Sequence, residues 1–168
     1  MTKPKPVWIS EQAITAMNEA AWRAHPKETG GILLGVYVND RPWVTHSVQI
    51  ESAEPRHNFY RLPSGARPRI VDELRKKDGR LGYLGEWHSH PANIGPSLKD
   101  KLSLTRIALH SRTTCPNPLL IVAIRGDTGY SLDIREWRGW RLKRLRAILA
   151  GGLPRQNTQP TPLILENR

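Results

Sequence analysis

Two histidines one residue apart are the residues of this chain whose types and spacing most directly suggest chemistry. They stand in "GEWHSHPANIGPSLKD", which runs from Gly85 to Asp100. The residues before them read as a β-strand, and residues two apart in a strand point to the same face about 6.6 Å apart. His88 and His90 can therefore reach one metal ion, although an isolated strand histidine is more often a structural residue.

A third metal ligand must come from elsewhere, because a catalytic zinc ion generally takes three protein ligands and a water. Asp100 is the best candidate, since "SLKD" places it one turn into an expected helix, where its carboxylate can point back to the strand. The same residues also fit a capping box, with Ser97 as N-cap and Asp100 favourable to the helix dipole. Glu86 lies on the same strand face as His88 and competes with Asp100, either as ligand or as an outer partner of the ligands.

A glutamate far upstream completes the set of chemical groups. Glu28 precedes the glycine pair of "ETGGILLG", at the start of an apolar strand that can lie beside the histidine strand. A carboxylate that does not bind the metal suits metal-assisted hydrolysis, because it can accept a proton from water and return it to a leaving amine. The alternative is a solvated glutamate beside Lys27, and spacing alone does not separate the two.

Alternating helices and strands must position these residues. Ser10 is a plausible N-cap for a first helix that ends near His25 and Pro26. Two strands follow, joined by the turn Asn39-Asp40-Arg41-Pro42, and they predict a hairpin. A long connection over 51–68 comes next, of a length typical of functional or mobile loops.

Helical and strand patterns also alternate in the second half. A helix is predicted over 67–80, with Gly79 as its stop and with Ile70, Val71 and Leu74 directed inward. A strand then ends at the histidines, and a third helix begins near Ser97, with four expected apolar positions: Leu98, Leu102, Ile107 and Leu109. The last two strands flank "GDTG", a strong hairpin signal. The order predicts an α/β (α+β) fold with a central mixed sheet flanked by helices.

Length and composition favour one domain. The 168 residues carry 26 Lys and Arg against 15 Asp and Glu, a net charge of +11 that attracts acidic proteins or nucleic acid, or merely solvates the surface. We expect an N-terminal arm over 1–8, a domain over 9–150 and a disordered, proline-rich tail over 151–168. The single cysteine, Cys115, excludes an intramolecular disulfide. No run approaches the roughly 18 apolar residues of a membrane span, so a cytoplasmic protein without membrane contact is expected.

Together, the four chemical elements resemble the JAB/MPN metalloprotease family, also called JAMM. The family pattern is an early glutamate, then His-x-His-Pro, then Ser-x-x-Asp, and it is met here by Glu28, His88-Ser89-His90-Pro91 and Ser97-Leu98-Lys99-Asp100. The match covers roughly Ile9 to Trp137. "ETGGILLG" and "YLGEWHSHP" look like the prokaryotic branch, found in integrative elements and anti-phage operons. The family usually has one residue more between the second histidine and the serine than the six found here.

The resemblance implies a cytidine-deaminase-like MPN fold and a zinc-dependent isopeptidase or peptidase. His88, His90 and Asp100 would hold one Zn²⁺ per chain. Glu28 would be the general base, and Ser97 would hydrogen-bond the tetrahedral oxyanion, a contribution of roughly 3 kcal/mol. No covalent intermediate is needed, so Cys115 is expected to be an ordinary loop thiol without a catalytic role.

The implied substrate is the bond after the C-terminal glycine of a ubiquitin-like protein, joined to a lysine or to a short extension. An extended tail can dock by adding a strand to a sheet edge. The loop from Arg56 to Pro68 could form one wall of that groove, with Phe59 and Tyr60 either as contacts or as ordinary packing. Expected partners are the ubiquitin-like protein or its conjugate, and ubiquitin-activating and ubiquitin-conjugating homologues.

Two rival functions are open at this point. Some members of the family are non-catalytic scaffolds, although this chain has every expected site residue. The stretch "WRGWRLKRLR" interleaves Trp137 and Trp140 with cations, which suits single-stranded nucleic acid. It also reads as a strand running into an amphipathic basic helix that docks an acidic partner or anchors the sheet.

Overall fold

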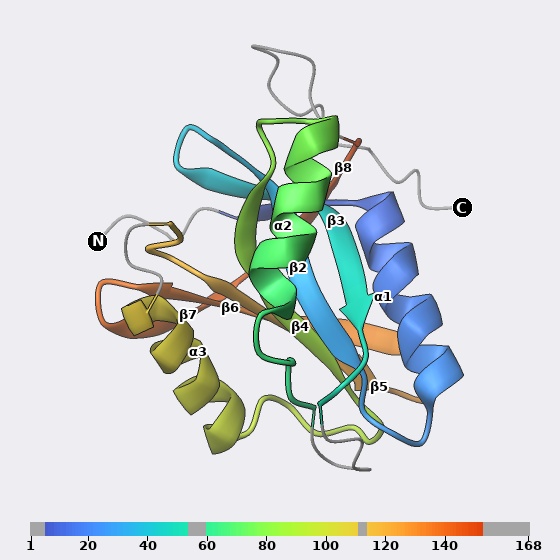
Figure 1. The fold of residues 1–168 in the computed structure, drawn as a ribbon. Helices are drawn as coiled ribbons and strands as arrows, with labels where there is room; N and C mark the ends of the chain where they lie inside the picture. The colour runs from blue at the N-terminus through green and yellow to red at the C-terminus, as the bar shows by residue number, and fades with distance from the viewer. Residues whose placement is uncertain (1–5, 54–59, 111–113, 153–168) are drawn as a thin grey trace.

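The computed structural model describes residues 6–53, 60–110 and 114–152, and this part of the chain forms three helices and eight strands (Figure 1). In chain order they are β1 (Val7–Ser10), α1 (Glu11–Ala24), β2 (Gly30–Val38), β3 (Arg41–Ile50), α2 (Ala66–Lys77), β4 (Gly82–His90), α3 (Leu98–His110), β5 (Leu119–Arg125), β6 (Tyr130–Arg138), β7 (Arg141–Leu145) and β8 (Ala147–Ala150).

The eight strands form one curled, mixed sheet in the order β7-β6-β5-β4-β2-β3-β1-β8. β4 runs parallel to β5 and β1 runs parallel to β3 and β8, whereas the other neighbours are antiparallel. The two edge strands follow each other in the chain with only Arg146 between them, which requires the sheet to curl. The predicted mixed α+β class with flanking helices is confirmed.

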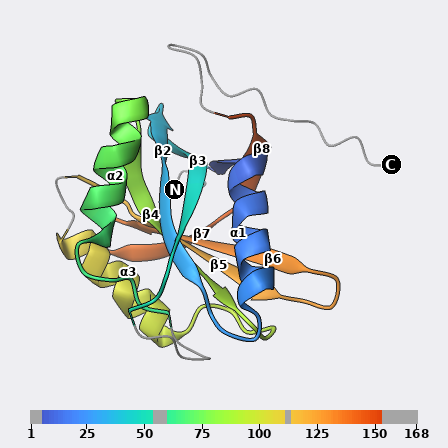
Figure 2. The ribbon, with the colours of Figure 1, turned by 45° about the vertical axis from the view of Figure 1, so that its right-hand side comes forward.

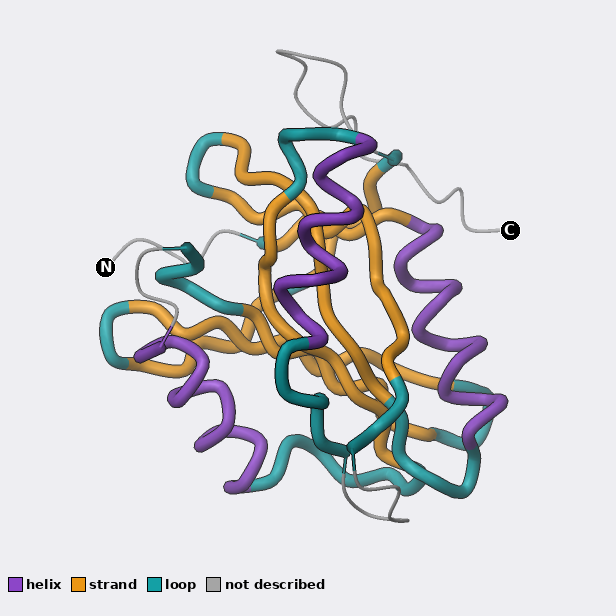
Figure 3. Tube along the Cα trace, in the orientation of Figure 1, coloured by secondary structure: helices purple, strands orange, loops and turns teal. Residues whose placement is uncertain are grey.

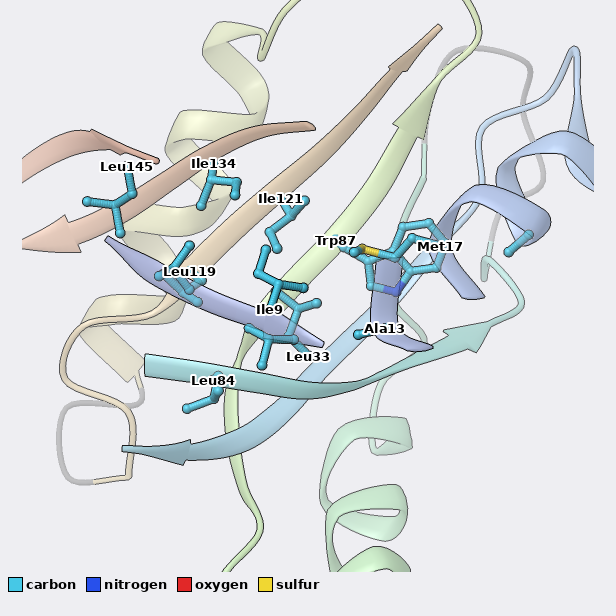
Figure 4. Close-up of a cluster of buried hydrophobic side chains, with 13 residues drawn as sticks. Ile9, Ala13, Met17, Leu33, Leu84, Trp87, Leu119, Ile121, Ile134 and Leu145 are labelled. Atoms are coloured by element: carbon cyan, nitrogen blue, oxygen red, sulfur yellow. The ribbon is translucent and has the colours of Figure 1, made fainter. Parts of the chain in front are cut away.

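The helices cover the two faces of the central strands. α1 lies on one side of β2 and β4, and α2 and α3 lie on the other (Figure 2). On the α1 side, Met17 and Ala13 pack with Leu33, Trp87 and other fully buried side chains (Figure 4). On the opposite side, α2 and α3 contribute Val71 and Ile107 to a second cluster. β4 is therefore buried on both faces, and its histidines lie at the end of a rigid element.

Local sequence signals explain the elements that were predicted correctly. Ser10 caps α1, because its side chain accepts a hydrogen bond from the backbone N–H of Ala13 at 3.1 Å. Asn39 and Asp40 both have positive φ, 50° and 59°, which is the backbone of a tight hairpin turn between β2 and β3. The turn is shorter than expected, since Arg41 already pairs with Val38.

The basic C-terminal segment and the residues at the two domain boundaries take positions that the sequence patterns did not indicate. The basic segment after Trp140 forms β7 and β8, not a helix, because each adds to an open edge of the sheet. Val7 and Trp8, assigned to an arm, are buried in β1. Gly151, assigned to the tail, accepts a hydrogen bond from the indole of Trp43. Residues 1–5 and 153–168 of the predicted arm and tail lie outside the described residues.

The apolar face predicted for the third helix was also wrong. Ile107 is buried as expected, but the other buried side chains of α3 are Leu104 and Ala108. Leu98 and Leu102 are instead 73% and 53% exposed. The helix packs through a face that the leucine spacing does not define.

A bulge in β4 sets which way the histidines point. The pairing with β2 shifts between Leu33 and Leu34, opposite Gly85, which has φ of +150°. A Cβ on Gly85 would lie 2.0 Å from the carbonyl oxygen of Leu119. Only glycine fits where two strands approach so closely.

We expect Gly85→Ala to destabilise the protein by about 3 kcal/mol or more, because both the backbone and the neighbouring strand must shift. Gly82→Ala is the matched control in the same strand, since its nearest contact would be an ordinary 3.9 Å. Urea denaturation of both variants measures the difference. Equal free energies of unfolding for the two variants would contradict this account.

Candidate metal centre

The pairing of β2 with β4 brings the distant glutamate to the histidines. Gly30 lies opposite His88 in the antiparallel ladder. Continuing that register by two residues places Glu28 opposite His90. The structure has Glu28 Oε1 at 3.9 Å from His90 Nε2. The loops around this end of the sheet, after α1, before α2 and between β4 and α3, gather at the lower side of Figure 3.

Two imidazoles and one carboxylate converge on a single point. His88 Nε2 and His90 Nε2 are 3.1 Å apart, Asp100 Oδ1 is 3.3 Å from the first, and Asp100 Oδ2 is 3.5 Å from the second. Ligands placed tetrahedrally around zinc at its usual bond lengths are about 3.3 Å apart. The spacing and the chemistry of the three donors therefore fit one tetrahedral metal ion.

The hydrogen bond of His90 leaves the correct ring nitrogen available. Its Nδ1 lies 2.7 Å from the carbonyl oxygen of Ile94. A carbonyl only accepts, so Nδ1 carries the proton and Nε2 keeps its lone pair toward His88 and Asp100. A backbone carbonyl behind a histidine commonly fixes the ring of a metal ligand in this way.

Asp100 acts as a capping residue and also faces the histidines, so the two alternatives from the sequence coexist. Its Oδ2 accepts hydrogen bonds from the backbone N–H and the hydroxyl of Ser97, at 2.6 and 2.7 Å. Ser97 Oγ in turn accepts from the backbone N–H of Asp100 at 3.2 Å. Oδ1 remains directed at His88. The loop that is one residue short of the usual family length still delivers the carboxylate.

The charges around Glu28 suit a proton carrier. Burial raises the pKa of Glu28, and its electrostatic interactions with His88 and His90 partly oppose this shift. Burial also raises the pKa of Asp100, but the interactions of its carboxylate with the two histidines and with Ser97 outweigh burial, and the pKa falls. The two carboxylates are thus separated in basicity, and Glu28 is the better proton acceptor.

Glu86, the competing ligand, has another set of partners. The hydroxyl of Tyr83 donates a hydrogen bond to Glu86 Oε1 at 3.3 Å. The positive charge of Arg67 partly opposes the rise in the pKa of Glu86 that burial causes. Within the described residues, the group of converging ligand atoms consists of His88, His90 and Asp100. Glu86 therefore lies on the same face without joining the group.

Several residues that hold Glu28 in place were not foreseen. The backbone N–H of Ser89 donates to the carbonyl of Thr29 at 2.7 Å, and the backbone N–H of Thr29 donates to Ser89 Oγ at 3.1 Å. Gln49 donates to the hydroxyl of Thr29 at 2.9 Å. The sequence signal for this contact was the serine between the two histidines. A strand residue between two ligands faces the side opposite to them, so its side chain is free to hold a neighbouring segment.

The loop predicted to form a groove wall is described from Tyr60 onward. The hydroxyl of Tyr60 donates to the carbonyl of Ile50 at 3.1 Å, and its backbone N–H hydrogen-bonds Glu28. Its ring also packs against Gly30, where an added Cβ would meet it at 2.8 Å. Packing is therefore the observed role of Tyr60. Phe59 lies outside the described residues.

Comparisons with known proteins agree with this geometry. A family model described as prokaryotic homologs of the JAB domain matches residues 10–143. A protein of Enterobacter hormaechei named CD-NTase/cGAS isopeptidase is 36% identical, over 84% of this chain and 81% of its own length. This chain belongs to the prokaryotic JAB family.

Other relatives of this JAB protein extend the comparison. A probable metalloprotease of Sinorhizobium fredii is 32% identical, over 76% of this chain and 80% of its own. The solution structure of a protein from Desulfitobacterium hafniense has a TM-score of 0.67 at 18% identity, covers 91% of this chain and 99% of that one, and supports the fold alone. The JAB protein is a metallopeptidase of the JAMM type, as the relatives named isopeptidase and metalloprotease indicate.

A cleft of about 480 Å³ adjoins the candidate centre of the JAB protein. It lies between the end of α1, the start of β2 and the end of β3. Glu28 is one of its lining residues, together with Thr29, Gln49 and Glu51, and the lining also includes Arg23, His25 and Lys27. Glu28 therefore borders both the cleft and the histidines.

The cysteine of the JAB protein is buried and is not one of the groups of the candidate metal centre. Cys115 is fully inaccessible, and burial raises its pKa to about 12. We expect iodoacetamide at about pH 8.5, where an ordinary thiol is half ionised, to leave the folded protein unmodified. Mass spectrometry should show one adduct only after unfolding. Rapid alkylation of the folded chain would contradict the buried position.

The basic C-terminal segment of the JAB protein is partly neutralised by buried acids. Arg135 and Arg144 pair with Asp133 at 2.6 and 3.3 Å, and Arg138 pairs with Glu136 at 2.9 Å. These three cations form ion pairs with acidic residues of β6. Their involvement in the sheet weakens the alternative that the segment binds nucleic acid. None of the helices in the described ranges is long and apolar enough to cross a membrane.

Proposed function

We propose that this JAB protein is a zinc-dependent isopeptidase that cleaves the bond after the C-terminal glycine of a ubiquitin-like protein. The observation that best supports this proposal is the convergence of His88 Nε2, His90 Nε2 and the carboxylate of Asp100, spaced at 3.1 to 3.5 Å. Glu28 stands outside this group and is itself shielded from water. Three ligands with a separate base are the arrangement of catalytic rather than structural zinc.

In this proposal His88, His90 and Asp100 hold the ion. Zinc bound there supplies a Lewis acid that makes water nucleophilic near neutral pH. Glu28 accepts the proton that the attacking water releases when its oxygen bonds to the glycine carbonyl carbon. Glu28 then gives a proton to the nitrogen as the carbon–nitrogen bond breaks, and it is ready for the next cycle. The products are a free carboxylate and a free amine.

Ser97 is proposed as the donor to the oxyanion. Its hydroxyl donates to Asp100 Oδ2 in the structure and is solvent-exposed. A rotation about its side-chain bond would turn this donor toward substrate, while the backbone N–H of Ser97 keeps Asp100 in place. The expected contribution is that of one oxyanion donor, roughly 3 kcal/mol.

The substrate is inferred from chemistry and from the names of relatives. Two relatives are named CD-NTase/cGAS isopeptidase, which supports an amide on a lysine side chain as the bond cleaved. A ubiquitin-like protein joined through its C-terminal glycine presents such a bond at the end of an extended tail. Activating and conjugating enzymes of the ubiquitin type are the partners that would make it.

We expect the purified protein to contain about one zinc per chain and to cleave a glycyl–lysine isopeptide conjugate of a ubiquitin-like protein. The chelator 1,10-phenanthroline should abolish cleavage, and added zinc should restore it, because the metal supplies the Lewis acid. Elemental analysis and gel-based cleavage measure both. If the zinc-replete protein leaves ubiquitin-like and CD-NTase conjugates intact, the proposal is wrong.

A further inference from the structure

An arginine lies against two aromatic rings on the α1 side of the sheet. The guanidinium carbon of Arg125 is 4.2 Å from the ring centroid of Trp22 and 5.8 Å from that of Tyr130. The two rings meet edge to face, with their centroids 5.6 Å apart. The hydroxyl of Tyr130 donates to the backbone carbonyl of Ala21 at 3.2 Å, which ties the start of β6 to the end of α1. We call Trp22, Arg125 and Tyr130 the α1 cluster.

The α1 cluster stands at the end of the sheet that carries the candidate metal centre. His90 pairs with Ile124 in the parallel ladder of β4 and β5, so Arg125 lies beside the residue that follows His90. Ile124 packs on the α3 side of the sheet, whereas Ile121, which shares the strand face of Arg125, packs on the α1 side. The turn between β5 and β6 lies beside the end of α1 (Figures 1 and 2). The cluster and the histidines therefore occupy opposite faces of the same sheet end.

The guanidinium of Arg125 has a donor without an acceptor. Its Nη1 is buried and makes no hydrogen bond within the part of the chain that the structure describes. Asn18 Oδ1, one turn before Trp22 on α1, is also without a partner and so does not serve as the acceptor. An unpaired buried donor is unfavourable, and a ligand that accepts its hydrogen bond removes that cost. Trp22 is 50% exposed, so its indole can change rotamer and admit such a ligand.

A carboxylate is the ligand that fits the α1 cluster. The planar fork of a guanidinium matches the two oxygens of a carboxylate, and stacking on aromatic rings holds the fork in one orientation. The exposed indole can cover the methylene groups of a glutamate. The nearest acid in the chain, Asp127, is exposed and forms no ion pair with Arg125. The net charge of +11 further favours an acidic ligand.

The chemistry of Glu28 decides which part of the substrate reaches the α1 cluster. Glu28 must protonate the leaving nitrogen, and it borders the cleft at the end of α1. The lysine-bearing protein is therefore released on the α1 side. Trp22 is in the last turn of α1, only six residues before Glu28. The surface that surrounds the lysine can thus reach the cluster.

We propose that the α1 cluster binds a carboxylate of the lysine-bearing protein, so that acidic residues flanking the lysine favour cleavage. This inference rests on the proposed function, because it assigns the cluster to the protein released by an isopeptidase. Arg125 pairs with the carboxylate, Trp22 covers its side chain, and Tyr130 holds the hairpin on α1. The cluster lies on the opposite face from the metal ligands, so it acts on substrate binding and not on the chemical step.

The probe is a fluorescein-labelled peptide with a central lysine and two glutamates on each side of it. A second peptide has glutamines in place of the glutamates. We expect the zinc-loaded native protein to bind the glutamate peptide about tenfold more tightly by fluorescence anisotropy, because charge-assisted hydrogen bonds form with one peptide only. Neither peptide contains an isopeptide bond, so the measurement does not depend on cleavage.

Three variants locate the preference for glutamate. Arg125→Gln should bind the two peptides within about twofold of each other, because the charged fork is lost. Arg106→Gln is the matched control, since it removes the same charge from an exposed position on α3, and it should keep the preference. Trp22→Ala leaves the arginine in place and changes a half-exposed position, where effects on stability are small. It should reduce the preference to about threefold, because the indole no longer orients the guanidinium.

Equal affinity of the native protein for both peptides would overturn the inference. So would an equal loss of preference in Arg125→Gln and Arg106→Gln, since net charge alone would then attract the peptide. Single-stranded DNA that binds through Arg125 more tightly than the glutamate peptide would overturn it as well. A preference that depends on Arg125 and Trp22 would support the carboxylate site even if no conjugate is cleaved, and the proposed function alone would then fail.

Discussion

The His88→Ala variant is expected to lose its metal ion and its peptidase activity together. His88 supplies one of three converging ligand atoms, at 3.1 Å from His90 Nε2 and 3.3 Å from Asp100 Oδ1. Loss of a direct ligand should weaken metal binding by more than the ~100-fold typical of an outer partner. Activity should fall at least ~10³-fold, because both the Lewis acid and the geometry it imposes are lost.

Elemental analysis after gel filtration, paired with conjugate cleavage, measures this result. His110→Ala is the control, because His110 is an exposed histidine at the far end of α3. Circular dichroism should show the same fold for both variants, since His88 is at the end of its strand. A His88→Ala protein that keeps one metal ion per chain would remove His88 from the ligand set.

The Glu28→Gln variant is expected to keep its metal ion and lose most of its turnover. Glutamine has the same shape and can still accept the hydrogen bond from the Tyr60 backbone, but it cannot take a proton. General acid–base catalysis contributes about 10²- to 10⁴-fold, so kcat should fall by that factor with little change in KM. The contrast with His88→Ala separates the base from the ligands.

Glu51→Gln is the control for Glu28→Gln, because Glu51 lines the same cleft and is exposed. Its kcat should stay within a few-fold of the native value. Loss of zinc from Glu28→Gln would show that Glu28 helps to hold the ion, and unchanged turnover would show that another group carries the proton.

Most of the secondary structure could be predicted from the sequence because its signals are local. Ser10 as a helix cap, the apolar run of β2 and the alternation in β3 act over a few residues. The β7 and β8 strands could not be found this way. Their segment is basic and partly amphipathic, and it becomes strand only because β6 and β1 offer open edges. Such pairing overrides local preference.

The same distinction between local and long-range signals explains why the buried face of α3 was predicted wrongly. Leu98, Leu102 and Leu109 have helical spacing, and spacing alone assigns them to a core. The helix instead packs through Leu104, Ile107 and Ala108, because Asp100 must turn its first residues toward the histidines. Orientation was decided by contacts that are distant in sequence.

By itself, the sequence determined the chemical groups: two histidines on one strand face, a serine and an aspartate at a helix start, and a glutamate before two glycines. Strand periodicity and helix capping are local, so they fix these relations within each segment. Only the tertiary structure decided that Glu28 lies opposite His90 and that Asp100, but not Glu86, joins the histidines. Strand register and helix packing depend on the whole core, and no spacing along the chain contains them.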